Sequence, residues 1–258
     1  ARAGFALGCD VKDYSVFSRK NYFYPDLPKG YQISQFDKPL CEGGFLDIQL
    51  KETQKRIQIT RIHVEEDAGK LIHQGADAIE GASHSCVDLN RAGVPLIEIV
   101  SEPDMSSFEE ARAYVETLRE ILIHLDVCDG NMQEGSLRCD ANISLKPKGS
   151  QSLGTRTEIK NLNSYRSLER ALKAEYKRQA GILASGGSIT QETRNYDDQT
   201  QQTTSLRSKE DAHDYRYFPE PDLPPLILSK ETLAAWKQSL PELPKQKRER
   251  YRSELMIS

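Results

Sequence analysis

The sequence predicts an α+β fold, an antiparallel sheet with flanking helices. Residues 55–66 and 136–145 have the spacing of strands, and residues 94–100 are expected to form a short buried strand. Two amphipathic stretches predict helices over about 107–125 and 164–185. Because the strands mostly lack the regular spacing of βαβ units, the α+β class fits better than a doubly wound sheet.

The first segments of the chain are a helix end and a loop. Residues 1–9 (ARAGFALGC) are typical of the last turns of a helix, but they carry no initiator Met and no helix cap, so we expect a fragment. Residues 20–35 are predicted to be a loop, because Pro25, Pro28 and Gly30 interrupt them.

The two helices have clear end signals. Ser107 is a candidate N-cap, and Glu109 and Glu110 follow it in the first turn. Gly186 and Gly187 are expected to end the second helix. A polar strand pair over 191–195 and 203–208 and a Pro-rich segment over 218–225 are predicted to follow.

Length and charge set the domain organisation. The 258 residues suffice for one large domain, or for one large and one small domain. The net charge of −4 excludes a basic domain whose whole surface binds nucleic acid, although a local patch remains open. Residues 229–258 hold seven Lys and Arg against four Asp and Glu. We therefore expect one domain over 1–228 and helical material over 229–258.

Composition also indicates the compartment. Charged residues make up 29% of the chain and apolar residues 37%, as in ordinary soluble proteins. No apolar run approaches the ~18 residues of a membrane span, and no secretion signal opens the chain. The five cysteines are odd in number and form no CxxC pair. Reduced thiols in the cytoplasm, or in an organellar matrix, are expected.

Two acidic features at predicted strands are candidate functional groups. Glu98 interrupts the apolar run VPLIEIV, where a lone carboxylate needs a cation or hydrogen bonds to compensate its burial. The alternative is an edge strand on which Glu98 points to water. Glu65, Glu66 and Asp67 end the strand over 55–66. Alternation sends Glu65 and Glu66 to opposite faces, whereas a terminal bulge would turn both toward one site. A solvated acidic run is the alternative.

Two further carboxylates lie on later strands. Asp140 belongs to a uniformly polar strand face, which either meets water or lines a site. Glu158 shares a face with Arg156 and Lys160, and there the alternative is a surface ion pair.

Carboxylates from four segments, with few histidines near them, suit Mg²⁺ better than zinc. His63 shares the face of Glu65, and we expect a packed or hydrogen-bonded structural role for it. The sequence holds no GxxxxGK[ST], GxGxxG, GxSxG or HExxH motif, so nucleotide chemistry would need a carboxylate–Mg²⁺ site and scattered basic residues. The candidate basic residues are Arg61, Lys70, Arg138, Arg156, Lys160 and Arg216.

Two segments, 20–35 and 214–222, mix aromatic and charged residues. Nucleobases stack on such rings while the cations contact phosphate. A loop held in place by its own aromatic residues is the alternative.

Six strings resemble the GatB family, the B subunits of the tRNA-dependent amidotransferases, in the expected order. The resemblance covers about residues 9–228. The strings are RKNYFYPDLPKGYQISQFD (19–37), RIHVEEDAGK (61–70), VDLNRAGVPLIEIVSEPD (87–104), EGSLRCDANISL (134–145), EIKNLNS (158–164) and DYRYFPEPDLPPL (214–226).

The resemblance implies an ATP-dependent carbon–nitrogen ligase that acts as a complex of A, B and C subunits. In this family the B subunit uses ATP and Mg²⁺ to phosphorylate the side-chain carboxylate of Glu-tRNA(Gln) or Asp-tRNA(Asn). Ammonia that the A subunit releases from glutamine then displaces phosphate. The implied fold is similar to the glutamine synthetase/guanido kinase group, and no membrane partner is implied.

The resemblance also assigns metal-binding and catalytic roles to specific carboxylates, but it leaves the ATP-contacting residues unassigned. The carboxylates are Glu65, Glu66, Glu98, Asp140 and Glu158.

The chain also departs from the family pattern. Set against the family, the resemblance implies that an opening strand with a GLEIH-like motif would precede these residues, and that the rest of a C-terminal helical domain and a tail domain would follow them. We therefore expect impaired metal binding and no independent activity. Two other functions stay open, a non-catalytic tRNA-docking scaffold and a two-metal phosphatase or nuclease.

Overall fold

Residues 1–74, 83–208 and 214–256 are described in a computed structural model of the chain. Within these residues the fold combines several helices with mainly antiparallel sheets, which confirms the α+β prediction. The residues form two compact units. The first comprises Ala1–Phe45, Gln58–Glu102 and His213–Leu240, and the second comprises Leu46–Ile57, Pro103–Ala212 and Pro241–Ser258. The boundary expected near residue 228 is a different division of the chain and stays a prediction.

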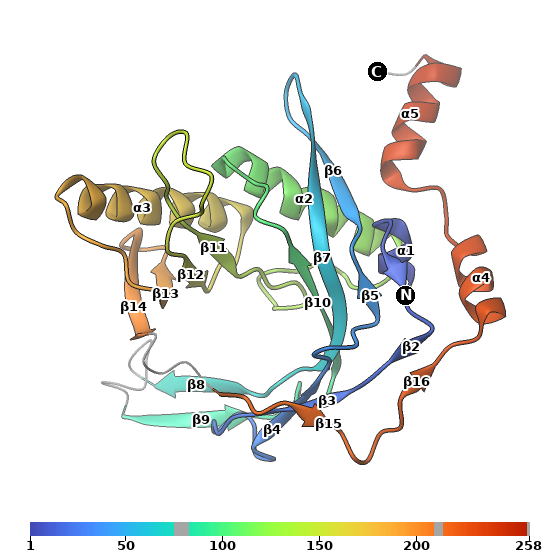
Figure 1. Ribbon diagram of the computed structural model, residues 1–258, viewed down its shortest axis with the longest axis horizontal. Helices are drawn as coiled ribbons and strands as arrows, with labels where there is room; N and C mark the ends of the chain where they lie inside the picture. The colour runs from blue at the N-terminus through green and yellow to red at the C-terminus, as the bar shows by residue number, and fades with distance from the viewer. Residues whose placement is uncertain (75–82, 209–213, 257–258) are drawn as a thin grey trace. The chain divides into compact units, whose positions relative to one another are not determined.

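A long strand, β7 (Gln54–Glu66), is central to the largest sheet, and the boundary between the units falls within it. Alternation buries Ile57 and Ile59, and Ile62 is buried beyond an irregularity in the pairing with β10 that lies between Ile59 and Arg61. In the first unit β7 pairs antiparallel with two strands, and Figure 1 shows it beside them. The sheet also contains β1, which pairs with β5, and β6, which pairs with β7. The bounds of these strands are β1 (Asp10–Val11), β5 (Cys41–Glu42), β6 (Phe45–Gln49) and β10 (Pro95–Ser101).

Three smaller sheets complete the first unit. β15 (Phe218–Pro219) pairs with β3 (Ser18–Asn21), which pairs with β4 (Tyr31–Ser34). β16 (Leu226–Ile227) pairs with β2 (Tyr14–Ser15), so residues 218–227 run along residues 14–21. β8 (Lys70–Gln74) pairs with β9 (His84–Asp88). The helices of this unit are α1 (Arg2–Ala6) and α4 (Lys230–Gln238).

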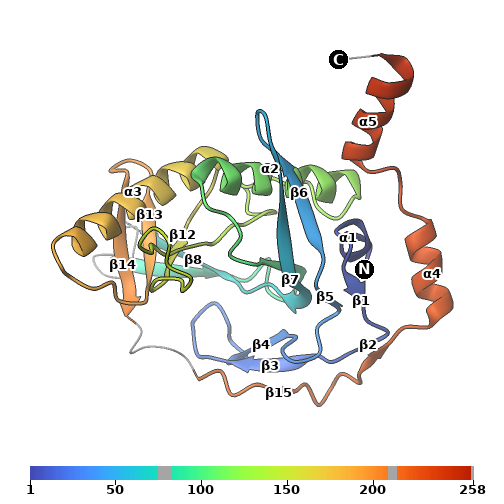
Figure 2. The ribbon, with the colours of Figure 1, turned by 45° about the horizontal axis from the view of Figure 1, so that its top comes forward.

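Among the described residues, the second unit contains a four-stranded sheet, three helices, and the paired ends of β6 and β7 that fall within Leu46–Ile57. The sheet has the order β11 (Ala141–Ile143), β12 (Thr157–Lys160), β13 (Glu192–Asp197) and β14 (Gln202–Ser208). The pairing of β12 with β13 is parallel, and the other two are antiparallel. Helix α3 (Tyr165–Ala184) runs alongside this sheet and contacts β11 and β14 (Figure 2). Helix α2 (Phe108–His124) contacts α3 and also α5 (Pro244–Leu255).

The core of the second unit lies on the apolar faces of α2 and α3 and on β12. Leucine, isoleucine and alanine recur there at the three- and four-residue spacing of a helix face. The buried residues include Leu118, Ile121, Leu122, Ile159, Leu168, Ala171 and Leu172.

Most local predictions are confirmed. Ser107 caps α2, with its Oγ accepting the backbone N–H of Glu110 at 3.1 Å. Ser164 caps α3 in the same way. The helix end at residues 1–9 and the polar strand pair are also present, as α1 and as β13 with β14.

Three predictions are wrong in detail. Residues 20–35 are not all loop, because both ends pair as β3 and β4. Residues 136–145 form a strand only over Ala141–Ile143. The strand near 94–100 is an edge strand that is largely unburied, because β10 pairs only with β7 among the described strands. In all three cases pairing partners, rather than local propensity, decide the outcome.

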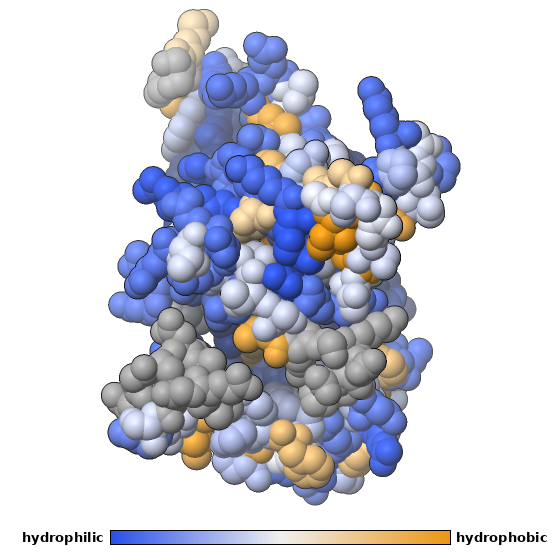
Figure 3. All heavy atoms as spheres, turned by 90° about the vertical axis from the view of Figure 1, so that its left-hand side faces the viewer, coloured by the Kyte–Doolittle hydropathy of each residue, from blue (hydrophilic) through white to orange (hydrophobic). Residues whose placement is uncertain are grey.

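The structure shows no membrane-spanning helix among the described residues, because every helix there is too short or too polar. The face shown in Figure 3 is hydrophilic over most of its area, with apolar residues in separated patches.

Candidate functional site

In the first unit, β7 and β10 place three side chains with metal-ligating atoms on one face. His63 and Glu65 are two residues apart on β7, so their side chains point to the same face. Glu98 on β10 lies directly opposite His63 in the antiparallel ladder. Directly opposed residues share a face, so strand geometry alone brings the three side chains together.

The three groups are close enough to act on one ligand. Nε2 of His63 lies 3.7 Å from Oε2 of Glu65 and 3.8 Å from Oε2 of Glu98. One ligand atom from each residue falls within 4.8 Å of the other two. Among the residues that the structure describes, no other set of three His, Cys, Asp or Glu side chains gathers this closely.

Glu65 is buried but stays ionised. Its side chain is 9% exposed, and Oγ of Ser34 donates a 3.3 Å hydrogen bond to Oε2. Burial raises the pKa of this carboxyl group, but His63, Lys20 and Ser34 outweigh that effect and hold the pKa below its usual value. A buried carboxylate is therefore available to bind a cation.

His63 is almost fully buried, as expected, and it also has an unexpected place in this group. Its Nε2 faces the two carboxylates, while its buried Nδ1 has no hydrogen-bond partner among the residues that the structure describes. The sequence signal was the shared face with Glu65. Nothing in the sequence showed that Glu98 would lie opposite.

Glu98 combines the two interpretations left open by the sequence. It lies on an edge strand and its side chain is 51% exposed. It nevertheless contacts His63, so exposure and participation in the group are compatible.

Glu66 does not join this group. It forms an ion pair with Lys29 and accepts the backbone N–H of Ile33 at 2.8 Å. Of the two arrangements left open by the sequence, the terminal bulge does not occur, because Glu65 and Glu66 face consecutive residues of β10 in regular register. Alternation therefore sends Glu65 and Glu66 to opposite faces. A metal-binding role for Glu66 stays a prediction.

Asp140 and Glu158 form a second group, in the second unit, together with Lys160. Nζ of Lys160 lies 2.7 Å from Oδ2 of Asp140 and 3.6 Å from Oε1 of Glu158. Ala141 pairs with Ile159 across the two antiparallel strands. Asp140, which precedes Ala141, therefore lies beside Lys160, which follows Ile159. The ion pair expected at Glu158 is present, and it includes Asp140.

Thr193 is a residue of this group that the sequence did not indicate. It lies opposite Glu158 in the parallel pairing of β12 with β13, and its Oγ1 donates a 2.8 Å hydrogen bond to Oε2 of Glu158. The two oxygens of Glu158 therefore have different partners, Thr193 at Oε2 and Lys160 at Oε1.

The two aromatic segments meet in the first unit. The guanidinium group of Arg19 lies 4.1 Å from the ring centre of Tyr31 and makes two hydrogen bonds to the carboxylate of Glu220. Phe36 stacks on Tyr217 with ring centres 4.3 Å apart. These contacts favour the interpretation that the segments hold each other in place.

Tyr217 belongs to the surroundings of the acidic group. Burial raises the pKa of its phenol to about 12, with Tyr215 and the carboxylates of Glu65 and Glu98 adding to the shift. It is thus a neutral hydroxyl at physiological pH.

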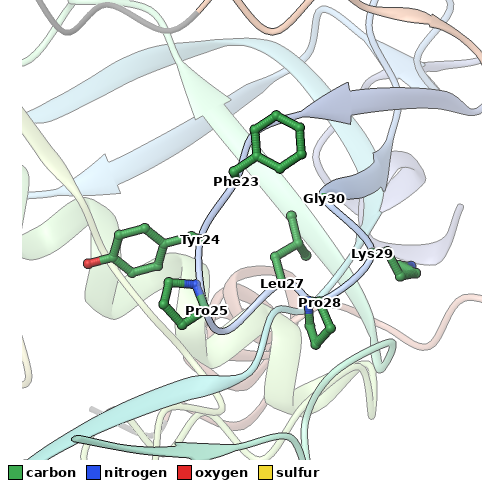
Figure 4. Close-up of a pocket in the computed structure, with 7 residues that line it drawn as sticks. All are labelled: Phe23, Tyr24, Pro25, Leu27, Pro28, Lys29 and Gly30. Carbon is green, nitrogen blue, oxygen red and sulfur yellow. The ribbon is translucent and has the colours of Figure 1, made fainter.

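A shallow hollow of about 400 Å³ lies on the loop between β3 and β4. Its lining comes entirely from residues 23–30, and Figure 4 shows Tyr24 and Lys29 projecting to opposite sides of the loop. The ring of Phe23 is 91% exposed. The hollow therefore borders the Lys29–Glu66 ion pair rather than the group around His63.

Comparison with known proteins identifies the family of the chain. The sequence model of the GatB/GatE catalytic domain matches residues 1–234. The chain is similar to the B subunit of the aspartyl/glutamyl-tRNA(Asn/Gln) amidotransferase of Nitratidesulfovibrio vulgaris, with 57% identity over all of this chain and 53% of that protein. The protein of the same name from Solidesulfovibrio magneticus is 58% identical, over 100% of this chain and 53% of that protein. The one from Thermosynechococcus vestitus is 57% identical, over 98% and 52%.

The chain spans about half the length of the curated relatives it matches. The family match nevertheless covers most of the chain and includes all five predicted carboxylates. The resemblance inferred from the six strings is therefore confirmed, and the chain belongs to the GatB/GatE catalytic-domain family.

Proposed function

We propose that the protein of this chain is the B subunit of a tRNA-dependent amidotransferase, an ATP-dependent carbon–nitrogen ligase. It would activate the side-chain carboxylate of Glu-tRNA(Gln) or Asp-tRNA(Asn) by phosphorylation and then direct its amidation. The names of the relatives, which mention aspartyl/glutamyl-tRNA(Asn/Gln), support this substrate class. The observation that carries the proposal is the convergence of His63, Glu65 and Glu98.

The group around His63 fits a divalent cation. Two carboxylates supply the oxygen ligands that Mg²⁺ prefers, and Glu65 is ionised although it is buried. An imidazole nitrogen is less usual for Mg²⁺ but suits Mn²⁺ and other transition metals. A cation there would supply Lewis-acid stabilisation of phosphoryl oxygens.

The residues of the chain have separable roles in this proposal. Glu65 and Glu98 hold the cation, and Ser34 fixes Glu65 by its hydrogen bond. Asp140 and Glu158 form a second cation-binding pair. Glu66, which the family resemblance also offers as a ligand, pairs with Lys29 here and would contribute less to cation binding than Glu65 and Glu98.

The remaining parts of the reaction involve partners. ATP is the phosphoryl donor, and ammonia comes from an A subunit in a complex that also contains a C subunit. We further propose that residues 1–228 form the catalytic domain, similar in fold to the glutamine synthetase/guanido kinase group. Residues 229–258, which include α4 and α5, would then begin a helical domain.

The test is an amidation assay with the assembled complex, Glu-tRNA(Gln), ATP and glutamine. Glu98→Gln keeps the size of the side chain but removes its charge, and we expect a loss of about 10²-fold or more in the rate of product formation. Glu109→Gln, on the first turn of α2, is the matched control and should retain activity. An undiminished rate for Glu98→Gln would contradict the assigned role.

A further inference from the structure

The second group contains its own cation. Asp140 and Glu158 both contact Lys160, and neighbouring carboxylates repel each other unless a positive charge neutralises them. The ammonium group of Lys160 supplies that charge, at 2.7 Å from Asp140 and 3.6 Å from Glu158. The group is partly open to solvent, with side-chain exposures of 47%, 32% and 36% for Asp140, Glu158 and Lys160.

A divalent cation would need the same oxygen atoms. Oδ2 of Asp140 and Oε1 of Glu158 both lie beside the ammonium group of Lys160, whereas Oε2 of Glu158 is engaged by Thr193. Mg²⁺ binds carboxylate oxygens at ~2.0–2.1 Å, so the ion and the ammonium would lie within a few ångströms of each other. Two positive charges at that separation repel strongly.

We propose that Lys160 is a resident cation that a divalent cation displaces, so that Lys160 sets the concentration at which the Asp140–Glu158 pair binds metal. This inference rests on the proposed metal-binding role of the pair. Lys160 is a positioning residue here. It holds the two carboxylates beside one positive charge without metal, and it withdraws when metal binds.

Thr193 limits the exchange of cations to one oxygen of Glu158. The hydrogen bond from Thr193 holds Oε2, so only Oε1 changes its partner when metal binds. β12 carries both Glu158 and Lys160, so the ammonium can leave by side-chain rotation with no change in strand pairing.

The first experiment measures Mn²⁺ binding by electron paramagnetic resonance in a Glu65→Gln/Glu98→Gln background. This background removes the other proposed site, so the binding that remains reports the Asp140–Glu158 pair. Lys160→Met removes the competing charge, and we expect roughly tenfold tighter Mn²⁺ binding. Lys160→Gln should behave in the same way, whereas Lys160→Arg should bind no more tightly than the background.

Lys148→Met is the matched control. Lys148 is an exposed lysine in the loop between β11 and β12, and its loss should leave Mn²⁺ binding unchanged. A lysine with a merely structural role would weaken binding when replaced, so a gain in affinity is specific to competition.

The second experiment needs no variant. Mn²⁺ should raise the labelling of Lys160 by an amine-reactive ester, measured by mass spectrometry relative to Lys148, because the displaced ammonium loses its carboxylate partners. Unchanged labelling at saturating Mn²⁺ would overturn the proposal.

The outcomes separate this inference from the function on which it rests. Equal or weaker binding in Lys160→Met and Lys160→Gln overturns the displacement and leaves the metal site standing. No Mn²⁺ binding in the background or in any Lys160 variant overturns both the displacement and the metal-binding role of Asp140 and Glu158.

Discussion

Both acidic groups bring a nitrogen-bearing side chain next to two carboxylates of like charge, but the nitrogen-bearing residue differs between them. Each places two carboxylates from neighbouring antiparallel segments around a nitrogen-bearing residue, His63 in the first unit and Lys160 in the second. In both, that residue lies two positions from one of the carboxylates along a strand, so it shares its face.

The groups differ in burial and in the chemistry of the nitrogen. Glu65 is 9% exposed, whereas Asp140 is 47% exposed. A neutral imidazole nitrogen can itself ligate a metal, but an ammonium group has no lone pair and can only compete with one. The first group is therefore suited to retain a cation, and the second is suited to exchange one.

The largest expected effect contrasts Glu65 with its neighbour Glu66. Glu65→Gln should weaken Mn²⁺ binding by more than the roughly 10–100-fold that loss of a supporting residue typically costs, because a buried charged ligand disappears. Glu66→Gln should change Mn²⁺ affinity little, because Glu66 faces Lys29 instead. Isothermal titration calorimetry with Mn²⁺ measures both.

Equal losses of Mn²⁺ affinity in Glu65→Gln and Glu66→Gln would contradict the different positions of these two side chains in the structure. They would mean that Glu66 turns into the site when metal binds, in line with the role that the family resemblance gives it.

A buried charge network lies beneath the second group. Glu175 on α3 is fully buried and binds Arg178 at 2.7 Å, and it also accepts hydrogen bonds from Gln179 and Thr203. Gln179 in turn contacts Thr157, the neighbour of Glu158 on β12. One face of this sheet thus packs on α3 while the opposite face carries the acidic pair.

Glu175→Gln should lower the free energy of unfolding by about 3 kcal/mol at pH 7, because Arg178 and Arg194 lose their shared partner. Burial raises the pKa of Glu175, but Arg178, Gln179 and Thr203 outweigh it and hold the pKa below its usual value of 4.5. A lowered pKa stabilises the fold above the usual value, and this contribution disappears as the pH falls through the lowered pKa.

The difference in unfolding free energy between the unaltered protein and Glu175→Gln should therefore be complete at neutral pH and narrow below about pH 4.5. Urea denaturation at a series of pH values measures it. Glu249→Gln on the exposed surface of α5 is the control and should show little difference at any pH. A difference in unfolding free energy that grows as the pH falls would contradict the lowered pKa assigned to Glu175.

The helices were predictable because their signals are local. Ser107 and Ser164 carry the capping hydroxyls, and Gly186, with its positive φ, follows the second helix. The hairpin of β3 and β4 was missed because Pro25 and Pro28 dominate its loop, while its pairing depends on residues at either end.

The sequence singled out Glu65 and Glu98 as candidates, but it predicted neither the place of His63 beside both of them nor the geometry of the group. Alternation placed His63 on the face of Glu65, yet only the register of β10 against β7 brings Glu98 opposite His63. Likewise, the hydrogen bond from Thr193 depends on a parallel pairing between strands more than 30 residues apart in sequence, which no local pattern encodes.

Thr193 gives the smallest expected effect and the sharpest test of the comparison. Thr193→Val keeps the branched shape but leaves Oε2 of Glu158 without its 2.8 Å donor. We expect Mn²⁺ binding by the second group to weaken by no more than about tenfold, at the low end for a supporting residue, because Glu158 is partly exposed and water can replace the hydroxyl. Thr193→Ser should restore the affinity, since it keeps the donor.

In both variants the affinity of the first group should be unchanged, because its supporting hydroxyl is that of Ser34. A parallel loss in both groups would show that they bind metal as one cooperative unit, which would remove the distinction between a retaining and an exchanging group.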